Sequence, residues 1–153
     1  MRYAILAVLL LAPALARAQP ASAPAYVLRQ GNGTATVLDR TSIRKEEGVT
    51  AITSMLLFAE PVKAGGVDWY WNDAFDEFDC AANAWRSRAD ARLNLARDKK
   101  QGLNDPDASE DWTPIDAGSL TAKEAALACK GETGGLTAVA DLKAFAAAFV
   151  GGH

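Results

Sequence analysis

The stretch VTAITSMLLF, residues 49–58, is the longest strand candidate in the chain and decides its fold. Polar and apolar residues alternate over its first half, which is typical of a strand with one buried face. Both sets of positions become apolar toward Phe58, which indicates that this end is covered on both faces. We expect Pro61 to end the strand, because proline cannot donate to a sheet ladder.

Segments with similar patterns flank this stretch on both sides. Residues 26–29 and 34–39 predict a hairpin, because the Gly-Asn-Gly sequence at 31–33 between them tolerates positive φ. Further short strands are expected at 41–44, 67–71 and 74–79. Residues 84–95 alternate at period two, although their content of Ala, Arg and Leu also suits a helix, and we favour a strand. Residues 97–111 are predicted to form a polar loop.

Helices are expected only at the end of the chain. Residues 121–129 predict a helix with a capping box formed by Thr121 and Glu124 and a stop at Gly131. Residues 137–150 predict an Ala-rich helix whose apolar stripe contains Leu142, Phe145 and Phe149. Strands first and helices last predict an α+β fold, with an antiparallel sheet and the C-terminal helices packed on one face.

The N-terminus has the features of a secretory signal peptide. Arg2 precedes an apolar run of about a dozen residues, which is shorter than the roughly 20 that a membrane span needs. The run closes on Ala-Arg-Ala at 16–18, so residues 1–18 are the predicted signal and the cut falls between Ala18 and Gln19. No cysteine lies near that cut, so we expect no lipoprotein. The mature chain would be periplasmic or secreted, without a transmembrane span.

The remainder divides into three predicted parts: a flexible leader at 19–25, a domain at 26–131 and a helical extension at 132–153. Arg2 and Arg17 leave with the signal, so 14 Lys and Arg face 19 Asp and Glu, a net charge of −5. This balance argues against nucleic acid as a partner, since affinity for nucleic acid depends on neutralising phosphates. It argues equally against adsorption to anionic lipid.

The chain holds two cysteines, Cys80 after the strand 74–79 and Cys129 in the helix 121–129. An even number in an exported chain favours a disulfide over two free thiols. A zinc pair is a poor alternative, because the only histidine is the terminal His153. Closing a loop of about fifty residues would stabilise the fold by roughly 4 kcal/mol in the chain-entropy description. The bond would tether the helix to the sheet.

No catalytic residues, cofactor or metal site are predicted. A terminal histidine cannot provide the positioned imidazole of a Ser-His-Asp or Cys-His unit. Glu77 and Asp79 would share one strand face about 7 Å apart, a spacing that could serve glycoside hydrolysis. The alternative that we favour is a solvated face beside basic side chains. The carboxylates concerned are Asp73, Asp76, Glu77 and Asp79, and the basic residues are Arg86, Arg88 and Arg92.

Two other segments contain candidate ligand groups. The acidic loop at 104–111 could hold calcium through oxygen ligands, but it lacks the glycine of an EF-hand loop, and a hydrated loop is the preferred interpretation. Alternation places Trp69 and Trp71 on one face of their strand and Tyr70 on the other. These aromatics either form core or provide a binding surface for a protein, peptide or glycan.

Several short motifs together resemble the surface-adhesin protein E-like family of exported bacterial domains. They are TVLD at 36–39 with Ser42 and Ile43, EFDC at 77–80, WRSR at 85–88, WTPIDAGS at 112–119, and the helix ending Ala128-Cys129. The resemblance covers residues 26–129. It implies an antiparallel sheet of about six strands with a disulfide-tethered helix against its concave face, and it implies that a homodimer can form.

The resemblance says little about activity. The adhesin of that family is lipid-anchored and binds host matrix proteins, whereas this chain lacks the anchoring cysteine and carries an extra predicted helix after Cys129. We expect an exported, non-enzymatic module that binds a protein or another envelope component. The alternatives are a structural or oligomerising envelope protein and a small hydrolase that uses Glu77 or Asp79.

Overall fold

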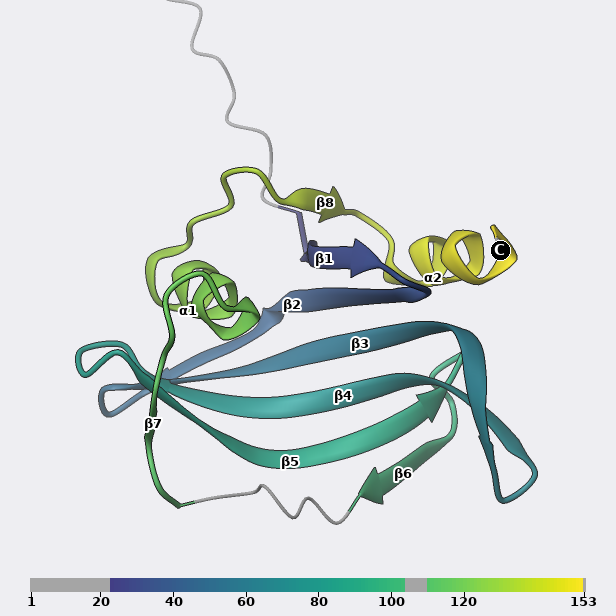
Figure 1. Ribbon diagram of the computed structural model, residues 1–153, viewed down its shortest axis with the longest axis horizontal. Coiled ribbons are helices and arrows are strands. Elements are labelled where there is room, and N and C mark those ends of the chain that lie inside the picture. The colour runs from purple at the N-terminus through teal and green to yellow at the C-terminus, as the bar shows by residue number, and fades with distance from the viewer. Residues whose placement is uncertain (1–22, 104–109, 153) are drawn as a thin grey trace, which may run out of the picture.

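The computed structural model describes residues 23–103 and 110–152 and shows one antiparallel sheet with two helices near the C-terminal end (Figure 1). The strands are β1 (Ala25–Gly31), β2 (Thr34–Glu46), β3 (Val49–Ala64), β4 (Val67–Asp79), β5 (Ala84–Asn94), β6 (Lys100–Leu103), β7 (Thr113–Pro114) and β8 (Thr137–Val139). The helices are α1 (Leu120–Lys130) and α2 (Leu142–Gly151). The order across the sheet is β6-β5-β4-β3-β2-β1-β8, and β7 pairs with β5. The predicted α+β class is confirmed, with eight strands in place of about six.

Tight turns join the long central strands. Between β1 and β2, Asn32 and Gly33 have φ angles of 51° and 71°. Between β3 and β4, Gly65 and Gly66 have φ angles of 61° and 73°. Two successive positive φ angles match the right-handed twist of the flanking strands, which is why glycine and asparagine occur here. The turn predicted at 31–33 is confirmed.

Three predicted strand boundaries are wrong. β3 continues past Pro61 to Ala64, and its pairing with β4 is irregular between Leu57 and Val62. Proline is tolerated at such an irregularity because no ladder bond is required from its nitrogen. The strands predicted at 34–39 and 41–44 are one strand, β2, with a register shift between Asp39 and Arg44 in its pairing with β3. Residues 67–71 and 74–79 likewise form the single strand β4.

Short elements at the sheet edges also differ from the predictions. β5 confirms the strand favoured for residues 84–95, but β6 lies inside the predicted loop at 97–111. Residues 137–139 form β8 against β1, and α2 begins only after Asp141, whose side chain accepts hydrogen bonds from two backbone N–H groups of the first turn. Three-residue and four-residue edge strands form through tertiary pairing, which leaves almost no local pattern.

The first helix is confirmed, but its predicted cap is wrong. Ser119 is the N-cap of α1, and its side chain accepts a hydrogen bond from the backbone N–H of Ala122 at 3.0 Å. Glu124 does not close a capping box with Thr121, because its side chain is buried against the sheet. At the other end Gly131 adopts a left-handed conformation with φ of 71° and donates to the last carbonyls, as a helix-stopping glycine does.

The helices pack on opposite faces of the sheet, whereas one shared face was expected. Val37 of β2 belongs to the apolar cluster that contains Ala146 and Phe149 of α2. The next residue, Leu38, belongs to the cluster that contains Leu127 of α1. Consecutive residues of a strand point to opposite faces, so the two clusters lie on opposite sides. β8 at the sheet edge carries the chain from one face to the other, and Figure 1 shows it between the two helices.

A disulfide joins α1 to the sheet. Cys80 directly follows β4, Cys129 lies in the last turn of α1, and their Cα atoms are 5.8 Å apart. The predicted pairing and the tethering of helix to sheet are therefore confirmed.

Candidate functional site

Charged side chains of β4 and β5 meet on one surface of the sheet. Glu77 and Arg86 are cross-strand partners, and Nη2 and Nε of Arg86 lie 2.6 Å and 2.7 Å from the same oxygen of Glu77. Arg88 lies two residues further along β5, with its Nε 3.8 Å from the other carboxylate oxygen. The pairing of the two strands thus orients both guanidinium groups.

The segment that precedes β7 completes this arrangement. Glu110 accepts from Arg88 Nη1 at 2.7 Å and from Arg86 Nη1 at 3.3 Å. The guanidinium of Arg86 also lies over the ring of Trp112, 4.5 Å from its centroid, which is a cation–π geometry. Trp112 is 36% exposed and, with Val62, is one of two large hydrophobic side chains exposed among the residues described.

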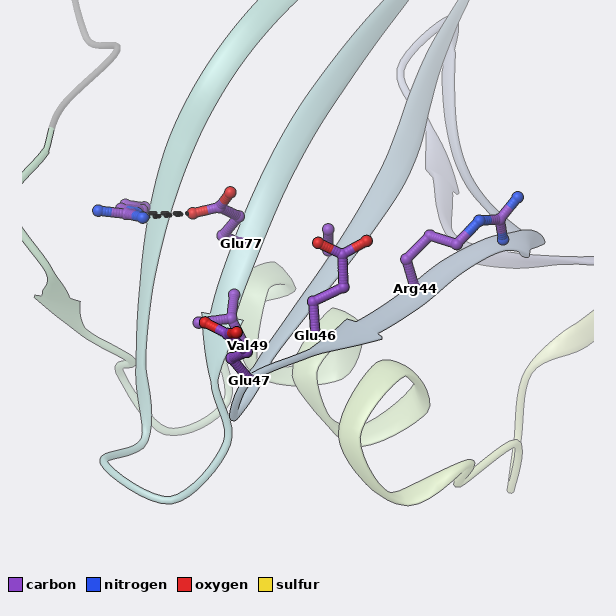
Figure 2. Close-up of a pocket in the computed structure, with 7 residues that line it drawn as sticks. Arg44, Glu46, Glu47, Val49 and Glu77 are labelled. Carbon is purple, nitrogen blue, oxygen red and sulfur yellow. Dashed lines mark hydrogen bonds and ion pairs between the residues drawn. The ribbon is translucent and has the colours of Figure 1, made fainter.

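A cleft of about 730 Å³ lies beside these residues (Figure 2). It is lined by Arg44, Glu46, Glu47, Val49, Ala51, Glu77 and Arg86. In the figure, the carboxylate of Glu46 points into the space between Arg44 and Glu77. Within the described part of the chain, neither Glu46 nor Glu47 forms an ion pair. We refer to the cleft residues together with Arg88, Glu110 and Trp112 as the Arg86–Trp112 surface.

Arg88 and Glu110 shift each other's pKa on this surface. The hydrogen bond from Arg88, together with its positive charge, lowers the pKa of Glu110, and the same contacts raise the pKa of Arg88. Both residues are exposed, so solvent screens the interaction and its contribution to stability is small. The network positions the side chains and leaves the charges open to a partner.

The four carboxylates considered for acid/base chemistry do not converge on one site. Asp73 is buried and accepts two hydrogen bonds from Arg97, at 3.0 Å and 2.6 Å. Asp79 accepts from the backbone of the turn after β4, at 3.0 Å and 2.8 Å. Glu77 is bound by Arg86, and Asp76 lies on the face of Phe78 that α1 covers. Glu77 and Asp79 therefore have separate partners and no shared reaction space between them.

A buried carboxyl pair, which the sequence did not predict, lies between α1 and the sheet. Glu124 is 6% exposed and Asp76 is 5% exposed. Burial and the negative charge of Asp76 raise the pKa of Glu124 to about 7, although a hydrogen bond with Ser54 lowers it. The spacing of Glu124 from Leu127 and Ala128, three and four residues later, places all three on one helical face and was the available signal.

The predicted aromatic group is largely inside the protein. Trp71 is 1% exposed and packs, together with the half-buried Tyr70, in the apolar cluster that contains Phe149 of α2. Trp69 is 7% exposed, lies outside that cluster, and donates from its indole to the carbonyl of Ala64 at 3.0 Å. Pairing with β5 is irregular between Trp69 and Trp71, which explains why simple alternation fails here. Binding by these three residues stays a prediction.

The exposed tryptophan, Trp112, appeared in the sequence analysis only within a family motif. Its signal was an aromatic residue in an otherwise polar stretch between Ser109 and Pro114. The contact between Trp112 and Arg86 could not be predicted from the sequence, because it depends on the pairing of β7 with the start of β5, which is distant in the chain.

Residues 104–109 of the acidic loop considered for calcium, and the terminal His153, lie outside the described residues, as do the predicted signal and most of the leader. Within the described ranges, no group of three His, Cys, Asp or Glu residues is placed to hold a metal ion. No helix in those ranges is long and apolar enough to cross a membrane.

Comparison with known proteins gives one family. The model of the surface-adhesin protein E family matches residues 26–130, which is more than half of the 153-residue chain. No curated protein and no solved structure matches. The match contains both cysteines and the whole Arg86–Trp112 surface. The chain therefore belongs to the surface-adhesin protein E family.

Proposed function

We propose that this protein is an exported, non-enzymatic binding module that recognises a protein of the cell envelope through the Arg86–Trp112 surface. Family membership supports an adhesin-like role. The predicted signal at 1–18 supports export to the periplasm or the medium. Asp73, Glu77 and Asp79 each bind a different partner, which argues against carboxylate-dependent hydrolysis.

The observation that carries the proposal is the stacking of Arg86 on the exposed ring of Trp112. Tryptophan and arginine are the side chains most enriched among residues that dominate binding energy at protein interfaces. Glu77 already holds Arg86 in one orientation, so a partner need not order this long side chain on binding.

The charges around this stack support selection of a partner. Arg44, Glu46 and Glu47 surround the cleft, and both signs of charge lie within a small area. Such a pattern increases the rate of encounter with a complementary surface and disfavours surfaces of the wrong pattern. We therefore expect a partner protein with its own mixed charges and an apolar group that contacts Trp112.

The test is capture from an envelope extract with a photo-crosslinker at position 112, followed by affinity measurement with the purified partner. A crosslinker at Arg29, an exposed residue of β1, is the matched control. Trp112→Ala should weaken the affinity about 30-fold, since a dominant interface residue contributes about 2 kcal/mol. Arg29→Ala should leave it unchanged.

Two results would overturn the proposal. One is equal capture from positions 112 and 29, and the other is a partner whose affinity is the same for Trp112→Ala and the unmodified protein. Capture of a second copy of this chain, together with a dimer in light scattering, would instead support the homodimer that the family resemblance implies.

A further inference from the structure

A small apolar pocket lies elsewhere on the sheet and shares no residue with the Arg86–Trp112 surface. Its volume is about 170 Å³, and it is lined by Phe58, Val62, Trp69, Trp71, Asn72, Arg92 and Leu103. These residues come from the adjacent strands β3, β4, β5 and β6, so the pocket lies on the sheet itself.

Five of the seven lining side chains are apolar, and none of the seven is acidic. Val62 is 48% exposed, which leaves an apolar side chain at the mouth. Trp69 is held by its indole hydrogen bond to Ala64, so one wall of the pocket is fixed before any ligand arrives. Apolar walls with one or two polar groups are typical of sites for small molecules.

Arg92 is the unusual member of this lining. Its Nε is buried and has no hydrogen-bond partner, and Arg92 forms no ion pair with any residue that the structure describes. The neighbouring arginines of the same region differ, because Arg86, Arg88 and Arg97 each bind a carboxylate. A half-buried guanidinium without a counter-charge is unfavourable, and an arriving anion would relieve that cost.

We infer that this pocket binds a medium-chain fatty carboxylate, with the carboxylate on Arg92 and the acyl chain against Trp69 and Phe58. A guanidinium donates two parallel hydrogen bonds to a carboxylate in a planar arrangement, and Asn72 offers a further polar contact. The volume of about 170 Å³ encloses the first methylene groups of the chain, and the remaining methylene groups lie against the exposed Val62 at the mouth.

The test uses three probes and calorimetric titration of the purified protein. Octanoate carries both the charge and the chain, octanol lacks the charge, and butyrate lacks most of the chain. We expect octanoate to bind at least about tenfold more tightly than either of the others. Equal affinities for octanoate and octanol, or no heat of binding with octanoate, would overturn the inference.

Arg92→Gln separates a binding role from a structural one. This variant should reduce the affinity for octanoate to that for octanol and leave the affinity for octanol unchanged. Arg29→Gln removes the same charge from an exposed position on β1 and should change neither affinity. Unchanged octanoate binding by Arg92→Gln would contradict the assignment.

A fluorescence measurement covers the case in which Arg92→Gln does not fold. Bromine at the end of the chain quenches tryptophan on contact, so 8-bromooctanoate should quench part of the emission of the unmodified protein. Trp69→Phe keeps an aromatic wall and should reduce that part to the contribution of Trp71, which also lines the pocket. Quenching of the same extent in Trp69→Phe, or no quenching of the unmodified protein, would place the ligand elsewhere and overturn the inference.

Discussion

The two helices are held to the sheet in different ways. α1 is fixed by the Cys80–Cys129 bond, and its buried face includes the carboxyl of Glu124 opposite Asp76. α2 has no covalent tether, and its buried residues are Ala146 and Phe149, supported by Leu142 and Phe145. One interface thus combines a covalent bond with buried polar groups, and the other depends on apolar packing.

The difference shows how a polar interface can be maintained in a small protein. A buried pair of carboxyl groups opposes docking whenever both are ionised, because burial and like charge both disfavour the charged form. A disulfide restricts the unfolded chain regardless of that repulsion and so offsets it. An apolar interface such as that of α2 needs no such support.

The largest expected effect comes from removing the tether. Cys80→Ala with Cys129→Ala should lower the free energy of unfolding by about 4 kcal/mol, as closing a loop of 49 residues predicts. Urea titration measures this loss. Hydrogen exchange should show α1 opening well below the global unfolding energy while α2 stays protected. Equal local opening of both helices would remove the distinction between them.

The apolar interface is tested by Phe149→Ala. Phe149 is 8% exposed and stacks on Phe145 with ring centroids 6.2 Å apart. Its removal should cost about 3 kcal/mol in urea titration and should free α2 while α1 stays docked. Ala148→Ser changes an exposed position of the same helix and should cost less than about 0.5 kcal/mol. A similar loss from both variants would mean that α2 is not held by this side chain.

The polar interface is tested by Glu124→Gln as a function of pH. The pKa of Glu124 is raised from 4.5 to about 7 in the folded protein, so the folded state binds the proton more tightly than the unfolded state. The stabilising effect is complete below pH 4.5 and is lost as the pH rises through about 7. Glu124→Gln should flatten this dependence and should stabilise the protein at pH 8 by a value on the order of 2 kcal/mol.

Glu132→Gln is the control for that experiment, since its side chain is exposed and lies only 3.9 Å from Lys130. It should leave the pH dependence unchanged. Stability curves of Glu124→Gln and the unmodified protein that run parallel between pH 4.5 and 8 would contradict the raised pKa.

The smallest effects concern the helix caps. Ser119→Ala and Asp141→Ala each remove an oxygen that accepts from the first turn, and each should cost about 1 kcal/mol. Hydrogen exchange of the first-turn amides should increase more in Asp141→Ala, which affects the untethered α2, than in Ser119→Ala. Thr121→Ala, at the position where the sequence predicted a cap, should cost less than about 0.5 kcal/mol. A larger loss from Thr121→Ala than from Ser119→Ala would reverse the assignment of the cap.

The features predicted correctly from sequence are those with local causes. The hairpin at 31–33 needs residues that accept positive φ, and the strand pattern of residues 49–58 needs only alternation. β6, β8 and the irregularity near Pro61 depend on which strand lies alongside, so no local pattern marks them. The opposite placement of the helices follows from β8 and was missed for the same reason.

The candidate site was predictable only in part. Glu77 lies beside basic residues of the next strand, as predicted, because the pairing of strands in a hairpin determines which side chains are cross-strand neighbours. The approach of Trp112 to Arg86 was not predictable, because it depends on β7 joining the start of β5. Glu124 was misassigned because a capping box and a buried helix face share the same spacing in the first turn.

The Cys80–Cys129 bond also determines what happens to the molecule after backbone damage. Every peptide bond between the two cysteines, including those of β5, β6 and β7, lies within one covalently closed ring. A single protease cut anywhere in that ring would leave both fragments joined at unchanged mass, apart from one added water. Such nicked molecules would be visible on a gel only after reduction.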